Sequence, residues 1–146
     1  MSGNNRAAGI VFTDGFHILL MKRSECENEH TWDLPGGHSK ANETPIETAE
    51  RETKEETGIK KIPGEFFNHF KNDGYTTFFC NVKKTFKIKV NKEHSEYNWV
   101  KFKDIKNKNL HPKLKLSMKK ILKIIKKNIK KFNEWVVLKN EENFFN

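Results

Sequence analysis

Three glutamates stand at a spacing that could do chemistry together. Glu52, Glu55 and Glu56 occupy positions i, i+3 and i+4, so on a helix their carboxylates project from neighbouring positions of one side. Like charges held this close cost free energy unless a cation or several hydrogen-bond donors compensate. Carboxylate oxygens suit hard divalent cations such as Mg²⁺ and Mn²⁺. On spacing alone, however, a glutamate-rich helix face is more often solvated surface than a metal site.

The residues around these glutamates predict a helix over residues 45–57. Thr44 is an N-cap hydroxyl, Pro45 follows at the first helical position, and Glu47 at the third completes a capping box. Gly58 supplies a left-handed stop. The helix should therefore run for about three and a half turns. The side beside the glutamates is its expected core contact, formed by Ile46, Ala49 and Thr53.

A longer pattern over residues 37–59 favours the metal site. Its fixed members are glycines, glutamates and one arginine at set intervals: Gly37, Glu43, Arg51, Glu52, Glu55, Glu56 and Gly58. This pattern resembles the signature of the Nudix hydrolases at every charged and glycine position. At frequencies of about 5–7% per residue, a chance match has a probability below roughly 10⁻⁷ per start position. Thr53 stands where the family usually has an aliphatic residue, and we expect a local loss of packing there without loss of chemistry.

The resemblance implies a metal-dependent site. The carbonyl of Gly36 and the carboxylates of Glu52, Glu55 and Glu56 match the family's ligands for Mg²⁺ or Mn²⁺. Arg51 is implied to brace these carboxylates through forked hydrogen bonds, a geometry that lysine cannot copy. The alternative for Arg51 is an ordinary surface ion pair within the helix.

The remaining roles in this segment are structural or still open. Gly37 permits a backbone turn that a side chain would obstruct, and Glu43 contributes to the bracing or to an outer metal. Glu52 is the general base in some family members, whereas others use a residue from a later loop. The alternatives for that later residue are Glu93, His94 and Glu96, and we favour Glu96 as a further ligand or base.

The activity that the resemblance implies is hydrolysis of a nucleoside diphosphate linked to another group, such as a (d)NTP or a nucleotide sugar, to a nucleoside monophosphate. The alternatives are hydrolysis of an RNA 5′ end, including decapping, and a non-catalytic module that binds nucleotide or RNA. Arg23 is a candidate contact for phosphate. Tyr75 and Phe79 are candidate stacking surfaces for the base, although aromatic strand residues are more often core.

The elements that must position these residues can also be predicted. Strand-like runs cover residues 6–12 and 16–23 around a turn signal, Asp14-Gly15, and residues 62–70 and 75–82 around Asp73-Gly74. Residues 85–90 predict an exposed strand or extended loop, and residues 96–102 a last strand. A helix with an apolar stripe is expected over residues 112–132. The resemblance implies an α/β/α sandwich around a mixed β-sheet, with this C-terminal amphipathic helix on the second face.

Length and charge limit the organisation. The 146 residues, 35% of them hydrophobic, fit one compact domain, expected over residues 1–133 with a tail at 134–146. The net charge is +9, and thirteen lysines face a single acid, Asp104, between Lys101 and Lys131. RNA is therefore a second expected partner class beside small nucleotides. An AT-biased coding sequence would also enrich lysine.

The cellular setting follows from what the sequence lacks. No apolar run approaches a membrane span, and the N-terminal residues do not read as a secretory signal. The two cysteines, Cys26 and Cys80, are too few for a disulfide scaffold. We therefore expect a cytoplasmic protein without a membrane partner. The sequence leaves its oligomeric state open between monomer and homodimer.

Overall fold

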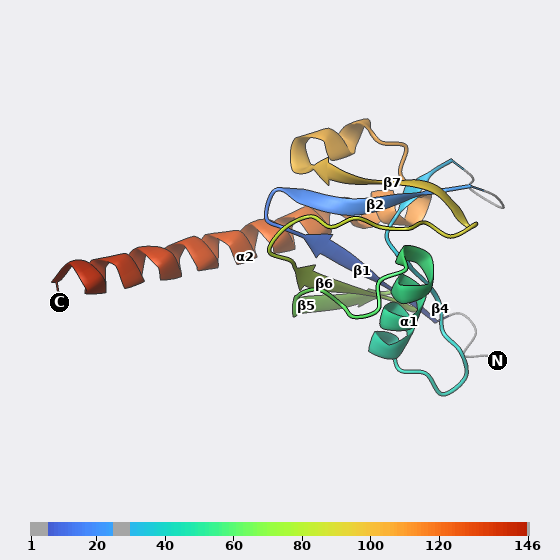
Figure 1. The fold of residues 1–146 in the computed structure, drawn as a ribbon, viewed down its shortest axis with the longest axis horizontal. Helices are drawn as coiled ribbons and strands as arrows, with labels where there is room; N and C mark the ends of the chain where they lie inside the picture. The colour runs from blue at the N-terminus through green and yellow to red at the C-terminus, as the bar shows by residue number, and fades with distance from the viewer. Residues whose placement is uncertain (1–5, 25–29, 146) are drawn as a thin grey trace.

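The computed structural model describes residues 6–24 and 30–145. Within them, seven strands form one mixed sheet (Figure 1). In chain order the strands are β1 (Ala7–Thr13), β2 (His17–Arg23), β3 (Trp32–Asp33), β4 (Gly36–His38), β5 (Glu65–Asn72), β6 (Tyr75–Asn81) and β7 (His94–Lys101). The spatial order is β3-β2-β1-β6-β5, with β4 paired to β1 and β7 paired to β2. Only β1 and β6 run parallel, so the predicted mixed sheet is confirmed.

The two strand pairs expected around Asp-Gly turns are both present, but they differ in how far they pair. β5 and β6 form a long antiparallel hairpin. β1 and β2 pair antiparallel only near their turn, with Thr13 opposite Ile18, and β2 finds its long partner in β7 instead. β7 begins at His94, two residues before the expected start. Most of the expected loop at 24–30 lies outside the described residues, as does Cys26.

The sheet is covered on both faces, as the predicted sandwich requires. Helix α1 (Pro45–Thr57) packs on the face that presents Ile10, Phe12 and Leu19, and contributes Ala49 to that layer. Residues 85–90 form no strand, but Phe86 and Ile88 pack on the same layer. Burial of apolar side chains on each face is the main stabilising term for such a layer.

The opposite face is covered by helix α2 (Pro112–Phe145), which follows the short 3₁₀ helix η2 (Phe102–Asn107). Four residues of the predicted apolar stripe are buried against the sheet: Leu114, Met118, Ile121 and Ile125. The expected helix end at residue 132 was wrong, because α2 continues as one helix to Phe145 and extends well beyond the sheet (Figure 1). Residues 133–145 contain no glycine or proline, so no helix-breaking residue ends α2 earlier. The division into a domain at 1–133 and a tail at 134–146 stays a prediction.

The structure bears on two sequence-based expectations, the one about membrane-spanning segments and the one about the cysteines. Within residues 6–24 and 30–145, none of the helices has the length and apolar character needed to cross a membrane. Cys80 is buried in β6 as a free thiol, and burial raises its pKa to about 12. The thiol is therefore neutral and packs as part of the core layer under α1.

Candidate active site

Helix α1 begins and ends where its sequence dictates. The Thr44 hydroxyl accepts the Glu47 N–H, and the Glu47 carboxylate accepts the Thr44 N–H at 2.8 Å, which is the predicted capping box. Gly58 adopts a left-handed conformation with φ of 74°, as a C-terminal stop does. Both ends of the helix are thus fixed locally, and the fixed ends set the direction in which its glutamates project.

Arg51 joins three carboxylates. Its Nε lies 2.7 Å from one oxygen of Glu43, and one terminal nitrogen lies 3.0 Å from the other oxygen. The second terminal nitrogen lies 2.8 Å from Glu52 and 3.3 Å from Glu55. The hydrogen bonds from Arg51, assisted by the Lys40 N–H, lower the pKa of Glu43 to about 2. This is the forked geometry expected of a bracing arginine, and its importance for catalysis stays a prediction.

Glu56 lies on the buried side of the same helix. The residue is 3% exposed, and its carboxylate accepts the Gly36 N–H at 2.8 Å. Burial, followed by the neighbouring acids Glu52, Glu93 and Asp33, raises its pKa to about 9. This hydrogen bond holds the β4 segment against α1. Gly36 therefore lies beside Glu56, one of the carboxylates predicted to bind metal together with the Gly36 carbonyl.

A second segment brings further donor atoms to Glu56. One atom each from Glu56, Glu93 and His94 lie within 4.8 Å of one another. Burial and the nearby Arg23 lower the pKa of His94 to about 4, so its imidazole is neutral and does not neutralise Glu56. A buried carboxylate beside further oxygen donors and a neutral imidazole fits a divalent cation. Glu52 and Glu55 lie outside this tight group, held by Arg51.

Glu96 does not join this group. It pairs with Lys22 across β2 and β7, and its half-exposed carboxylate lies 3.7 Å from the Lys22 amine. The geometry favours Glu93 over Glu96 as the later-loop acid, and a role for either residue stays a prediction. The reason is a register shift in the pairing of β2 with β7. Glu96 lies opposite Lys22 and His94 lies opposite Arg23, so the two residues of β7 point to opposite faces of the sheet.

The proposed substrate contacts fall in three different settings. Phe79 is fully buried in the layer under α2, against Phe67 and Phe70, so its assignment as a stacking surface was wrong. The Tyr75 ring is largely enclosed, and its hydroxyl lies close to Gly9 and Gly36. Tyr75 therefore presents its hydroxyl to the β4 loop, and its stacking on a nucleotide base stays a prediction.

Arg23 lies at the end of β2, with a guanidinium nitrogen 3.7 Å from Asp33 and its backbone paired with His94. It is thus close to the site, and its contact with phosphate stays a prediction. Asp33 was missed by the sequence analysis. Burial raises its pKa, and its only signal was an acid set between the apolar residues Trp32 and Leu34.

Thr53, the position that departs from the family pattern, is fully buried. Its hydroxyl has no hydrogen-bond partner among the described residues, and leaving such a group unsatisfied costs free energy. We predict that Thr53→Val, which keeps the shape and removes the hydroxyl, raises the free energy of unfolding by about 1–2 kcal/mol.

Urea denaturation measures this change, and Thr57→Val is the matched control. The Thr57 hydroxyl is also buried but donates to the Thr53 carbonyl at 2.6 Å and accepts the Ile59 N–H. Its removal should therefore destabilise the protein by about 1 kcal/mol. A destabilised Thr53→Val protein would contradict the reading of Thr53 as an unsatisfied polar group.

The raised pKa of Glu56 predicts that metal binding depends on pH. In the metal-free protein the carboxyl is protonated at neutral pH, so a cation must displace that proton. The affinity for Mg²⁺ should then strengthen with pH up to about 9, by at most about tenfold per pH unit. The same raised pKa means that the contribution of Glu56 to the stability of the metal-free fold is greatest below the ordinary pKa of 4.5 and is lost as the pH rises through the folded value.

Calorimetric titration of Mg²⁺ at about pH 6.5 and about pH 8.5, in buffers of different ionisation enthalpy, counts the released proton. Glu56→Gln is the control, because it removes the titrating group and should flatten the pH dependence. Proton release that is the same in both proteins would show that another group is displaced.

Residues 3–123 match the family model of the NUDIX domain. With the glutamate-bearing helix and its arginine brace in place, this match shows that the chain belongs to the Nudix family. The fold agrees: a Nudix hydrolase from M. smegmatis superimposes with a TM-score of 0.71 at 24% identity, covering 85% of this chain and 87% of that one. A C. elegans Ap4A hydrolase superimposes with a TM-score of 0.65 at 22% identity, covering 82% and 96%.

Two sequence relatives have similar levels of identity to this chain. A nucleoside triphosphate pyrophosphatase/Nudix hydrolase fusion protein of Bifidobacterium longum is 32% identical over 74% of this chain, which spans 26% of that relative. A putative 8-oxo-dGTP diphosphatase 3 of Mycobacterium tuberculosis is 29% identical over 75% of this chain and 58% of its own length. The chain thus spans between a quarter and about three fifths of the length of these two relatives.

Proposed function

We propose that this protein is a metal-dependent pyrophosphohydrolase that cleaves a nucleoside diphosphate linked to another group and releases a nucleoside monophosphate. The observation that carries the proposal is the complete set of Nudix-pattern glutamates, held by Arg51 on one side and by the Gly36 amide on the other. A solvated helix face has no need for a buried carboxylate, and Glu56 is buried.

The residues divide the work between holding cations and activating water. Glu52, Glu55 and Glu56 would hold Mg²⁺ or Mn²⁺ with the Gly36 carbonyl, and such cations neutralise the diphosphate and lower the pKa of a bound water. Arg51 holds the Glu52 carboxylate in place at 2.8 Å, which leaves its oxygens positioned to accept the proton of the attacking water. Glu93 is the alternative base.

The substrate class is tested with a panel of nucleotides. The names of the relatives direct the choice: (d)NTPs with 8-oxo-dGTP among them, a dinucleoside tetraphosphate and nucleotide sugars, each with Mg²⁺ or Mn²⁺. A nucleoside monophosphate product, identified by chromatography, supports the proposal. Slow release of orthophosphate alone, or no turnover of any member, contradicts it. A cytoplasmic location belongs to the same proposal, because small nucleotides are cytoplasmic substrates.

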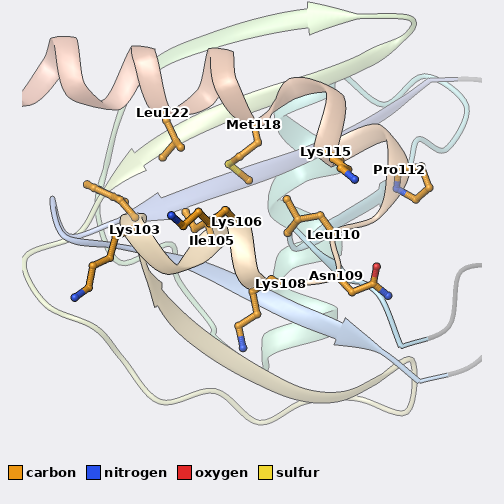
Figure 2. A pocket seen from close by; sticks show the side chains of 11 residues that line it. Lys103, Ile105, Lys106, Lys108, Asn109, Leu110, Pro112, Lys115, Met118 and Leu122 are labelled. Carbon is orange, nitrogen blue, oxygen red and sulfur yellow. The ribbon is translucent and has the colours of Figure 1, made fainter.

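A second substrate class, the 5′ end of RNA, is favoured by a pocket of about 770 Å³ between η2 and α2. Its floor includes Ile105 and Met118, and its rim carries Lys103, Lys106, Lys108 and Lys115. Figure 2 shows Met118 and Leu122 pointing from α2 toward the η2 segment. An apolar floor within a cationic rim suits bases and phosphates of a single strand.

Binding of a labelled 5′-triphosphorylated RNA, measured by fluorescence anisotropy at several salt concentrations, separates the two substrate classes. For RNA, the double variant Lys106→Glu/Lys115→Glu should weaken binding and lower the salt dependence. The control, Lys60→Glu/Lys61→Glu, changes the same charge beyond the end of α1. Equal losses in both would indicate only a general effect of net charge.

A further inference from the structure

The imidazole of His94, one of the three later-loop alternatives, lies outside the pattern of residues 37–59 in sequence but beside its Glu56 in space. The residue is 7% exposed and opens β7, directly after a turn at residues 91–93. Ser24, directly after β2, fixes this turn, because its N–H donates to the Glu93 carbonyl at 2.9 Å and its hydroxyl donates to the Lys92 carbonyl at 2.7 Å. His94 is therefore held rigidly beside α1.

The contacts of its ring decide which nitrogen carries the proton. Nδ1 lies 3.3 Å from the side-chain oxygen of Asn91. The same oxygen accepts the Glu93 N–H at 3.1 Å, which fixes this atom of Asn91 as the carbonyl oxygen, an acceptor only. Nδ1 must then carry the hydrogen, and Nε2 is left with a bare lone pair. Metal-binding histidines are oriented in the same way, with the other ring nitrogen donating to an oxygen.

The lone pair faces a gap of the size of a cation. Nε2 lies 3.9 Å from an oxygen of Glu56, which is too far for a hydrogen bond. Among the described residues this nitrogen takes part in no hydrogen bond, although the charge of the nearby Arg23 acts on the ring. Two metal–ligand bonds of about 2.1 Å each place their donor atoms roughly 3–4 Å apart, depending on the angle between them. A cation therefore fits between Nε2 and Glu56, and Glu93 lies close enough to be a third ligand.

We propose that His94 is a nitrogen ligand of one of the divalent cations of this site, together with Glu56 and Glu93, and that it biases the site toward Mn²⁺ over Mg²⁺. The inference rests on the proposed metal-dependent function and adds to it the identity of the preferred metal. Mg²⁺ binds oxygen ligands almost exclusively and keeps its waters. Mn²⁺ shares the preference of Mg²⁺ for oxygen ligands, but as a first-row transition metal it accepts an imidazole nitrogen more readily than Mg²⁺ does. A site of glutamates alone would offer no such discrimination.

The first test measures metal affinity without nucleotide. Free Mn²⁺ is counted by electron paramagnetic resonance during titration, and Mg²⁺ is measured by competition. His94→Gln places an amide oxygen near the position of Nε2, so it replaces the nitrogen donor by an oxygen donor. We expect the Kd for Mn²⁺ to rise by about tenfold or more, while the Kd for Mg²⁺ changes by less than about threefold.

The control is His69→Gln, because His69 is exposed on β5; it should leave both affinities unchanged. An unchanged Kd for Mn²⁺ in His94→Gln would overturn the proposal. Equal weakening of both metals would overturn it as well, since that result shows a structural role for His94.

The second test needs no variant and remains decisive if His94→Gln fails to fold. Pulsed electron paramagnetic resonance of the Mn²⁺-loaded wild-type protein detects hyperfine coupling to a directly bound nitrogen. Coupling supports His94 as a ligand, and its absence overturns the proposal. If the coupling is present but no nucleotide is hydrolysed, the proposed function fails while the metal site stands.

Discussion

Glu52→Gln lowers kcat by roughly 10³-fold or more and leaves the protein folded, if Glu52 is both a metal ligand and the acceptor of the water proton. The substitution keeps the size of the side chain and leaves an oxygen that can still accept from Arg51, 2.8 Å away. It removes the negative charge that a cation needs and the basicity that a general base needs. The loss should therefore fall on kcat more than on stability.

Steady-state kinetics with the best nucleotide of the panel, together with a thermal unfolding curve, measures both effects. Glu50→Gln is the matched control, because Glu50 lies in the same helix but outside the Nudix pattern. The same experiment decides between an enzyme and a non-catalytic binding module. Wild type and Glu52→Gln with equal rates of product formation would leave Glu52 without a catalytic role.

The parts of the fold that the sequence predicts well are those whose signals are local. Thr44, Pro45, Glu47 and Gly58 fix α1 through contacts within a few residues of one another. The Asp-Gly turns likewise mark both strand pairs. The helix end predicted at residue 132 fails for the opposite reason, since no local stop is present and the end of the apolar stripe was taken as the end of the helix.

The later-loop residue shows what local signals cannot supply. His94 and Glu96 are two residues apart, and simple alternation along a strand would put both on one face. The structure inserts a register shift beside Arg23, so His94 turns toward Glu56 whereas Glu96 meets Lys22. A shift of this kind depends on how β7 pairs with β2, strands that are more than 70 residues apart, and no pattern within β7 reveals it.

Phe79 was misassigned for a related reason. An aromatic residue in a strand predicts burial on one face but does not say whether that face is open to a ligand or covered by a helix. β6 pairs with both β1 and β5, so it is an interior strand, and α2 closes the face on which Phe79 lies. Whether Phe79 is accessible to a ligand therefore depends on α2, a helix near the C-terminal end of the chain.

Gly37→Ala should lower kcat by about 10²-fold, although no side chain that does chemistry is removed. A Cβ at this position would lie 2.6 Å from the carboxylate carbon and from one carboxylate oxygen of Glu52, closer than non-bonded atoms tolerate. Since Arg51 holds the other oxygen of Glu52, the carboxylate must leave its place rather than turn within it. A displacement of about 1 Å at a catalytic group can lower the rate by about 10²-fold.

The prediction is sharpened by combining the two substitutions. If Ala at position 37 acts by displacing Glu52, it has little further activity to remove once Glu52 is Gln, so the double variant should be nearly as active as Glu52→Gln alone. Multiplying losses would mean that Gly37 acts by another route, such as the conformation of the β4 loop. Kinetics of the four proteins in this cycle therefore tests whether the glycine is there to leave room for the carboxylate, which is the physical link between the backbone of β4 and the chemistry on α1.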